Sequence, residues 1–170
     1  MQQLLLDIQP APSPTLTNFF FFFNAELLSM LSGIVSQQEK EHYVYVWGDS
    51  GCGKSHLLRA MVDAYTQRNL KAVYCCAKNL HELIVDDALD CIAVDGIDIL
   101  SLSDQIRLFN LYNQLRDEGH AVLLMSGMAA PMYLDMRQDL VTRLGWGLVY
   151  QVLELTENER IQAMRQHATD

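Results

Sequence analysis

Residues 48–55 combine three glycines, a lysine and two serines in a spacing that suits the binding of phosphate. The segment reads Gly48-Asp49-Ser50-Gly51-Cys52-Gly53-Lys54-Ser55 and fits the P-loop pattern at every fixed position. Glycines let the backbone curl so that consecutive N–H groups point at phosphate oxygens. In such a loop the Lys54 ammonium reaches the terminal phosphates, and the Ser55 hydroxyl coordinates Mg²⁺. The segment therefore predicts a site for ADP or ATP with Mg²⁺.

The elements on either side of the loop supply the required context. An apolar run, Tyr43–Trp47, precedes it, and a helical pattern runs from Ser55 to about Arg68. Strand, glycine-rich loop and helix in this order place the phosphates at a helix N-terminus, whose dipole favours negative charge. His56, in the first helical turn, belongs to the predicted nucleotide-binding residues. A chance glycine-rich turn is the alternative, and the flanking elements argue against it.

The rest of the chain alternates helical patterns with short apolar runs. Further strands are expected at residues 72–76, 91–95, 121–126 and 148–152, and further helices at 24–38, 81–87, 103–118 and 132–144. This alternation predicts an α/β fold with a parallel sheet of about five strands and right-handed crossovers.

An acidic residue ends the apolar run 91–95. A carboxylate at the end of a buried strand beside a P-loop occupies the Walker B position, where Asp95 would hold Mg²⁺ through water; a turn cap is the alternative. Enzymes that hydrolyse the nucleotide usually carry a second acid next, but here Gly96 follows, and Asp98 lies two residues further on. We therefore expect the chain to bind the nucleotide well and to hydrolyse it poorly.

Ser126 lies at the end of the next predicted strand. Its hydroxyl could orient water or the terminal phosphate, or serve only in a turn.

Arg143 stands between a predicted helix and a Gly-Trp-Gly turn. A guanidinium presented there could reach a phosphate bound by a neighbouring subunit, as an arginine finger in trans. A surface salt bridge is the alternative, and spacing alone favours it.

Composition narrows the class of protein. The 170 residues carry a net charge of −9, and the basic residues are scattered, so we expect no sequence-specific DNA binding. The four cysteines have neither zinc-ligand nor redox spacing, which predicts a reduced, cytoplasmic chain; Cys75, Cys76 and Cys91, in apolar runs, are expected to be small core residues. The run Phe19–Phe23 is too short to span a membrane. Because five consecutive side chains cannot share one face, some are expected to be exposed or covered by a partner, or by a second copy in a homodimer.

Together these motifs resemble the nucleotide-binding domain of the bacterial DnaA family. The resemblance covers nearly the whole chain and is most specific at residues 142–147, which look like the family's arginine-finger box. It implies an AAA+ P-loop NTPase, a three-layer αβα fold, over residues 18–155. It also implies that Asn24 lies beside the adenine and that residues 156–170 form the first helix of the lid domain. The chain given stops inside that lid, so we expect the rest of the lid to be absent and nucleotide affinity to be reduced.

The tail 1–17 points to the small Hda branch of that family. Its residues Gln3, Leu4, Leu6 and Ile8 fit the pattern Gln-Leu-x-Leu-x-apolar, which resembles a sliding-clamp-binding peptide; a leucine-containing tail without a partner is the alternative. Such a segment would bury its apolar side chains in a clamp pocket while the glutamine amide bonds at the rim.

The resemblance implies an adaptor that joins ATP-bound DnaA to the clamp of DNA polymerase III and stimulates ATP hydrolysis on DnaA. Initiation of replication would thereby be switched off. A stand-alone ATPase or helicase-loader-like protein is one alternative, and it predicts hydrolysis by this chain alone. A binding module with a vestigial P-loop is another, and it predicts no nucleotide binding.

Overall fold

The computed structural model describes residues 15–16, 24–154, 156–159 and 161 of the chain. One sheet forms its centre, with strands β1 (Tyr43–Trp47), β2 (Ala72–Cys76), β3 (Cys91–Asp95), β4 (Val122–Gly127) and β5 (Leu148–Gln151). The α-helices are α1 (Ala25–Val35), α2 (Lys54–Gln67), α3 (Leu102–Glu118) and α4 (Gln138–Leu144), and short 3₁₀ helices span Ala77–Glu82, Ile97–Ile99 and Pro131–Tyr133. All strand pairs are parallel, in the order β2-β3-β4-β1-β5. The predicted α/β class and five-stranded parallel sheet are confirmed.

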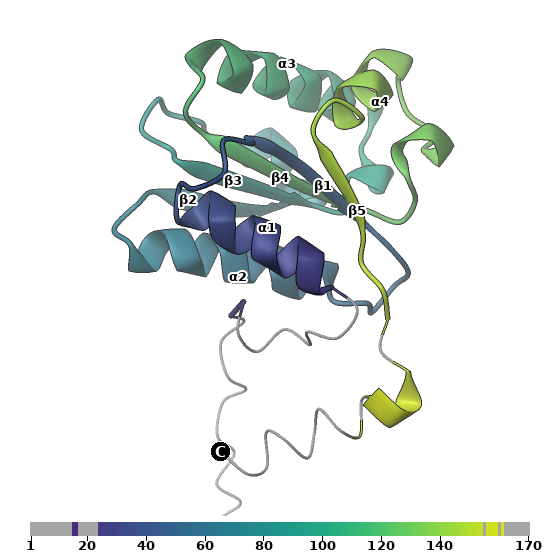
Figure 1. The fold of residues 1–170 in the computed structure, drawn as a ribbon. Coiled ribbons are helices and arrows are strands. Elements are labelled where there is room, and N and C mark those ends of the chain that lie inside the picture. The colour runs from purple at the N-terminus through teal and green to yellow at the C-terminus, as the bar shows by residue number, and fades with distance from the viewer. Residues whose placement is uncertain (1–14, 17–23, 155, 160, 162–170) are drawn as a thin grey trace, which may run out of the picture.

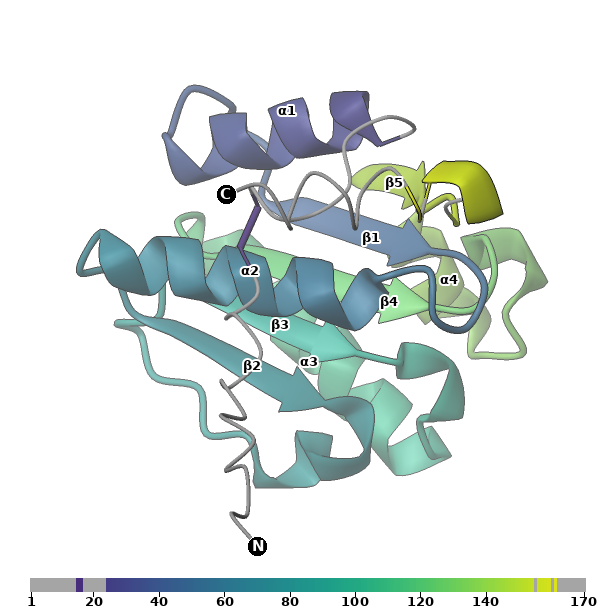
Figure 2. The same ribbon diagram turned by 90° about the horizontal axis from the view of Figure 1, so that it is seen from below.

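Helices cover both faces of this sheet. Helices α1 and α2 lie on one face, and α3 and α4 lie on the other (Figures 1 and 2). Because side chains alternate along a strand, each strand contributes to two cores. In β1, Val44 and Val46 join the core under α1 and α2, while Tyr45 joins the core under α3. The arrangement is a three-layer αβα fold.

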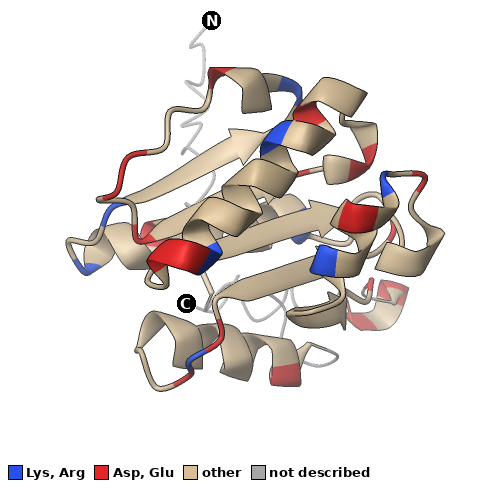
Figure 3. Cartoon of the chain, turned by 90° about the horizontal axis from the view of Figure 1, so that it is seen from above, with Lys and Arg blue, Asp and Glu red and all other residues tan. Residues whose placement is uncertain are grey.

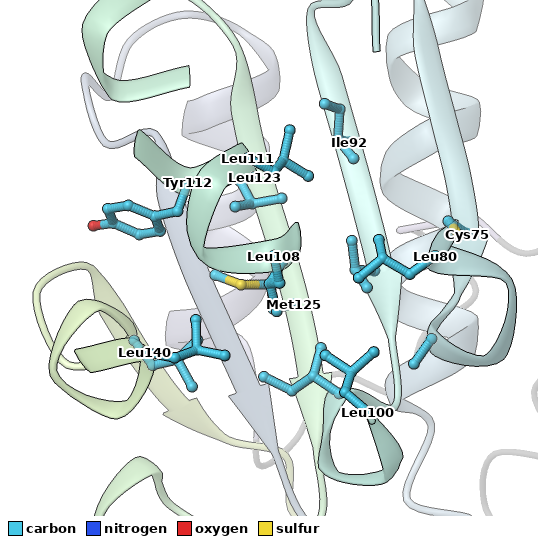
Figure 4. Close-up of a cluster of buried hydrophobic side chains, with 14 of the residues drawn as sticks. Cys75, Leu80, Ile92, Leu100, Leu108, Leu111, Tyr112, Leu123, Met125 and Leu140 are labelled. Atoms are coloured by element: carbon cyan, nitrogen blue, oxygen red, sulfur yellow. The ribbon is translucent and has the colours of Figure 1, made fainter. Parts of the chain in front are cut away.

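The core under α3 draws apolar side chains from most of the sheet. Ile92, Leu123 and Met125 meet Leu108 and Leu111 from α3 (Figure 4). Each of these side chains except Leu111 is at most 1% exposed. This core fixes α3 against the strands, and with it the segment that leads from β3 back over the sheet.

The strand order brings the chemically interesting strand ends together. β4 pairs with both β1 and β3, so Trp47 is in register with Gly127, and Val94 with Met125. In a parallel sheet all carboxyl ends lie at one edge, and ligands bind there, at the point where the strand order reverses. The loop after β1 and the ends of β3 and β4 therefore share this edge.

The predicted helix over residues 81–87 is wrong. The chain instead makes a 3₁₀ helix at Ala77–Glu82, and residues 83–86 have no regular structure. The Asp86 side chain accepts a hydrogen bond from the backbone N–H of Ala88 at 3.0 Å, and its carbonyl accepts one from Leu89 at 3.2 Å. This aspartate-built turn competes with helix formation, as Asp side chains commonly do.

The predicted helix over residues 132–144 is interrupted. A 3₁₀ helix at Pro131–Tyr133 is followed by irregular chain, and α4 begins only at Gln138. A contact with α3 is the reason: the side-chain oxygen of Gln105, a residue 6% exposed, accepts a hydrogen bond from the backbone N–H of Arg137 at 2.9 Å. That N–H would otherwise bond within the helix, so the helix starts after it.

Gly147 closes the junction between α4 and β5, and a side chain there would clash. A Cβ atom on Gly147 would lie 2.3 Å from the Tyr43 carbonyl oxygen and 2.7 Å from the Tyr43 Cβ, both next to the β1–β5 pairing. We expect Gly147→Ala to lower the free energy of unfolding by about 1–3 kcal/mol through overpacking. Denaturant unfolding of the purified chain measures it.

Gly145 provides the matched control. Its backbone is right-handed helical, with φ −79° and ψ −9°, and an added Cβ would come no closer than 3.6 Å to the Thr142 carbonyl oxygen. Gly145→Ala should therefore be neutral or stabilising by about 0.4–1 kcal/mol. Equal stabilities for the two alanine variants would contradict the close approach at Gly147.

Charges are dispersed over the described surface. Basic residues on the α3 side are interspersed with acidic ones rather than gathered in a stripe (Figure 3). Within the described ranges, no helix is both long and apolar enough to cross a membrane.

Candidate nucleotide-binding site

The loop between β1 and α2 has the curled backbone that its glycines predicted. Gly51 and Gly53 have left-handed conformations, with φ values of +83° and +103°. Gly53 is the N-cap of α2, which starts at Lys54. The N-terminus of α2, whose first N–H groups lack partners within the helix, therefore follows directly on the glycine-rich loop, and a helix N-terminus in this position favours phosphate.

The Lys54 side chain folds back over the loop that precedes it. Its ammonium donates to the carbonyl oxygens of Gly48 at 2.6 Å and Asp49 at 2.8 Å, and it contacts the sulfur atoms of Cys52 and Met128 at 3.7 and 3.9 Å. The charge is thus held within the loop, at the end of a four-carbon stem that can swing toward a phosphate.

A hollow of about 370 Å³ opens beside the loop. The predicted residues that line it are Ser50, Gly51, Gly53, Lys54, Ser55, His56, Asp95 and Ser126. Gly48, Asp49 and Cys52 do not line it, and Cys52 is 8% exposed. Cys76, Gly96, Asp98, Ile99 and Met128 complete the wall, so Cys76 is not the core residue that its type predicted.

Asp95 is the acidic centre of this hollow. Its Oδ2 accepts from the Tyr74 hydroxyl at 2.5 Å, and its Oδ1 accepts from the Ser126 hydroxyl. Burial raises the pKa of the carboxyl, but donation from the hydroxyls, Ser55 included, together with the nearby charge of Lys54, outweighs burial and leaves the pKa below its ordinary value. Asp95 is therefore ionised at neutral pH.

The oxygen atoms present fit a magnesium ion. Ser55 and Asp95 both line the hollow, and the Ser55 hydroxyl contributes to lowering the pKa of the Asp95 carboxyl, so a neutral and an anionic oxygen face the same space beside the loop. Mg²⁺ prefers such hard oxygen donors and is usually bound by one or two of them together with water and substrate phosphates. The predicted pair is brought together, although its role as a metal site stays a prediction.

Gly96, which follows Asp95, has a left-handed backbone with φ +77°, and its N–H donates to the Ser126 hydroxyl at 2.9 Å. A side chain would be strained in this conformation, although space is open around it. A second acid directly after Asp95 is therefore disfavoured by the backbone itself. Asp98 lines the hollow instead.

The model of the protein family described as the bacterial DnaA ATPase domain matches residues 13–151, which is most of the chain. The chain belongs to the bacterial DnaA ATPase-domain family. Its fold agrees with that membership. Domain III of the replication initiation protein DnaA from Thermotoga maritima superposes with a TM-score of 0.81 at 21% identity, covering 95% of this chain and 76% of that one.

Two further structures extend the comparison. AMPPCP-bound DnaA from Aquifex aeolicus gives a TM-score of 0.80 at 21% identity over 93% of this chain, which spans only 55% of that protein. A protein from Neisseria meningitidis, determined in solution, is 30% identical, with a TM-score of 0.52, over 90% of this chain and 96% of its own. The AAA+ P-loop fold expected from the sequence is confirmed, with a DnaA-type nucleotide-binding domain.

Within this DnaA-type domain, Arg143 lies in the last turn of α4 rather than after the helix. Its guanidinium carbon stands 4.0 Å from the Trp146 ring centroid and 5.3 Å from that of Phe109, and its Nε donates to the Asn113 side chain at 3.3 Å. None of the ion pairs in the described part of the chain involves Arg143, so the alternative of a surface salt bridge finds no support. The residue does not line the chain's own hollow.

Asn24 joins the start of the domain to its end. Its side-chain amide donates to the Leu153 carbonyl at 3.4 Å, and its side-chain oxygen accepts from the Leu153 N–H at 3.2 Å. The residue is 4% exposed and does not line the hollow. Its contact with adenine stays a prediction. His56 reaches the Thr15 carbonyl at 3.4 Å.

Sequence reasoning missed Tyr74, which contacts Asp95 directly, and Arg59, whose guanidinium lies 4.5 Å from the Tyr74 ring centroid. The sequence placed Tyr74 in a predicted strand but carried no signal for its contact with Asp95, which depends on the pairing of β2 with β3. The predicted clamp-binding residues Gln3, Leu4, Leu6 and Ile8, and the run Phe19–Phe23, fall outside the described residues.

Proposed function

We propose that this chain is an Hda-type adaptor, which binds the sliding clamp of DNA polymerase III and ATP-bound DnaA and stimulates hydrolysis of the ATP on DnaA. It would thereby act as a negative regulator of the initiation of chromosome replication in the cytoplasm. The observation that carries the proposal is the placement of Arg143, which is oriented by its neighbours but does not line the hollow of its own chain.

The surroundings of Arg143 suit a group that acts on another molecule's phosphate. The Trp146 ring stacks on the guanidinium, and the hydrogen bond to Asn113 uses Nε, which leaves the two terminal nitrogens for other acceptors. A guanidinium forks its terminal N–H groups toward phosphate oxygens and retains its charge throughout. Trp146 is 56% exposed, so this site is open to a partner.

Arg143 would stabilise the charge that develops on the transferred phosphoryl group of DnaA-bound ATP. In the adaptor itself, the P-loop would hold ADP or ATP, with Ser55 and Asp95 holding Mg²⁺, which screens phosphate charge when bound. Two DnaA-family structures give indirect support, since those proteins are bound to AMPPCP. We expect slow hydrolysis by the adaptor itself, because Gly96 replaces the second acid.

The tail would tether the adaptor to DNA-loaded clamps. Gln3, Leu4, Leu6 and Ile8 supply one amide and three apolar anchors at alternate spacing, as an extended peptide bound in a groove requires. Tethering raises the effective concentration of Arg143 near DnaA on the same DNA. The apolar Phe19–Phe23 run is the proposed surface for a homodimer or a partner.

A reconstituted assay tests the function as a whole. Hydrolysis of radiolabelled ATP bound to DnaA is followed with the chain alone, with free clamp and with clamp loaded on DNA. We expect acceleration only in the last reaction. Equal hydrolysis in all three would contradict the adaptor, and hydrolysis by the chain without DnaA would favour a stand-alone ATPase.

A further inference from the structure

The Asp95 carboxylate is held from both sides by hydroxyl groups of the neighbouring strands. Tyr74 comes from β2 and donates to Oδ2, while Ser126 comes from β4 and donates to Oδ1. Strands β2 and β4 are the two partners of β3, which carries Asp95. Each carboxylate oxygen therefore has one fixed donor and keeps lone pairs for further contacts.

The strand register explains how Tyr74 reaches Asp95. Tyr74 is in register with Ala93, and Asp95 lies two residues further along β3, on the same face of the sheet. This diagonal separation is within the reach of an aromatic side chain, and the hydroxyl at its tip closes the gap to 2.5 Å. A shorter or apolar residue at this position could not donate to the carboxylate.

Tyr74 is itself held in place. Its ring packs against the core between the sheet and α2, and the guanidinium of Arg59, one turn along α2 from Ser55, lies over the ring at 4.5 Å from its centroid. A cation over an aromatic face is attracted by the ring quadrupole. Helix α2, which begins at the P-loop, thus holds the Tyr74 ring through Arg59. The hydroxyl of that ring in turn holds the Asp95 carboxylate.

We propose that Tyr74 is a positioning residue for magnesium-dependent nucleotide binding, because its hydroxyl holds the Asp95 carboxylate in place in the hollow that Ser55 also lines. The inference rests on the nucleotide and magnesium part of the proposed function and is independent of the clamp and of DnaA. Groups that hydrogen-bond to a metal's ligands set the orientation of those ligands, and their loss typically costs 10–100-fold in metal affinity.

The test is the affinity for ADP with Mg²⁺ and with EDTA, measured by titration calorimetry on the full chain. Tyr74→Phe removes one oxygen and keeps the ring. We expect its ADP affinity in EDTA to match that of the wild type, while the gain in affinity on adding Mg²⁺ is about tenfold smaller. Tyr65→Phe is the matched control, since Tyr65 is a tyrosine of the same core but is not one of the hydroxyl donors to Asp95, and it should retain the whole gain.

Each other outcome overturns the proposal in a distinct way. An equal gain from Mg²⁺ in the wild type and Tyr74→Phe would show that the hydroxyl does not position Asp95, and the proposed function would stand. A loss of ADP affinity in EDTA as well would mean a merely structural role for Tyr74. Absence of ADP binding by the wild type would remove the inference and the nucleotide part of the proposed function together.

Discussion

Replacing Arg143 with alanine is expected to lower the clamp-dependent stimulation of ATP hydrolysis on DnaA by about 10³-fold or more, the range found for arginine fingers. The guanidinium is the group proposed to meet the developing charge, and alanine leaves no donor there. The measurement is the rate of hydrolysis of DnaA-bound ATP in the presence of DNA-loaded clamp. Binding of the variant to the clamp and to ADP should be unchanged, because Arg143 does not line the chain's own hollow.

Arg137→Ala is the matched control for this experiment. Arg137 precedes α4, is paired with the Asp139 carboxylate at 2.6 Å and lies on the surface. Its removal changes the net charge as Arg143→Ala does, but it should leave stimulation near the wild-type rate. If both variants lose stimulation equally, charge in this region rather than the position of Arg143 would explain the effect. Full stimulation by Arg143→Ala would eliminate the arginine finger.

Replacing Lys54 with alanine is expected to weaken ADP binding about 100-fold, because hydrogen bonds to charged groups contribute up to about 3 kcal/mol. The ammonium bridges the Gly48 and Asp49 carbonyls within the loop, so its loss also loosens the phosphate cradle. The measurement is the rise in melting temperature on adding ADP, which grows with ligand concentration relative to Kd. At an ADP concentration that stabilises the wild type, the variant should gain little.

Lys71→Ala controls for the loss of a positive charge. Lys71 is exposed in the segment after α2 and does not line the hollow. Its variant should show the same ADP-dependent rise in melting temperature as the wild type. A vestigial P-loop would instead give no rise for the wild type, Lys54→Ala or Lys71→Ala.

Strands were the part of the fold that local sequence predicted best. The bounds of β1, β2 and β3 agree with expectation because each is a short apolar run; Gly48 follows β1, Lys71 precedes β2, and β3 ends in Asp95. The helix expected at 81–87 was wrong because of a local aspartate turn, whereas the helix expected at 132–144 was interrupted by a contact between residues far apart in the sequence. The Asp86 side chain accepts from the Ala88 N–H, and the Gln105 side-chain oxygen accepts from the Arg137 N–H, so a backbone donor is taken up just after the first expected helix and within the second.

The same distinction holds for the candidate site. The P-loop and Asp95 were predictable because their chemistry is encoded in adjacent residues. Tyr74 was not, because its contact with Asp95 depends on β2 pairing with β3 in one particular register. Ser126 was predicted as a phosphate-facing or turn residue; it lines the hollow, and its buried hydroxyl donates to Asp95, while its role toward a phosphate stays a prediction. Both hydrogen bonds to Asp95 depend on the pairing of β3 with β2 and β4, which the sequence pattern alone did not provide.

Binding of the full chain to the bacterial sliding clamp tests the adaptor most directly. Surface plasmon resonance with immobilised clamp would compare the wild type, the double variant Gln3→Ala with Leu4→Ala, and Leu5→Ala as a control within the same tail. The account predicts binding by the wild type and Leu5→Ala and none by the double variant. Absence of binding by the wild type, or equal binding by all three, would contradict a clamp-dependent adaptor.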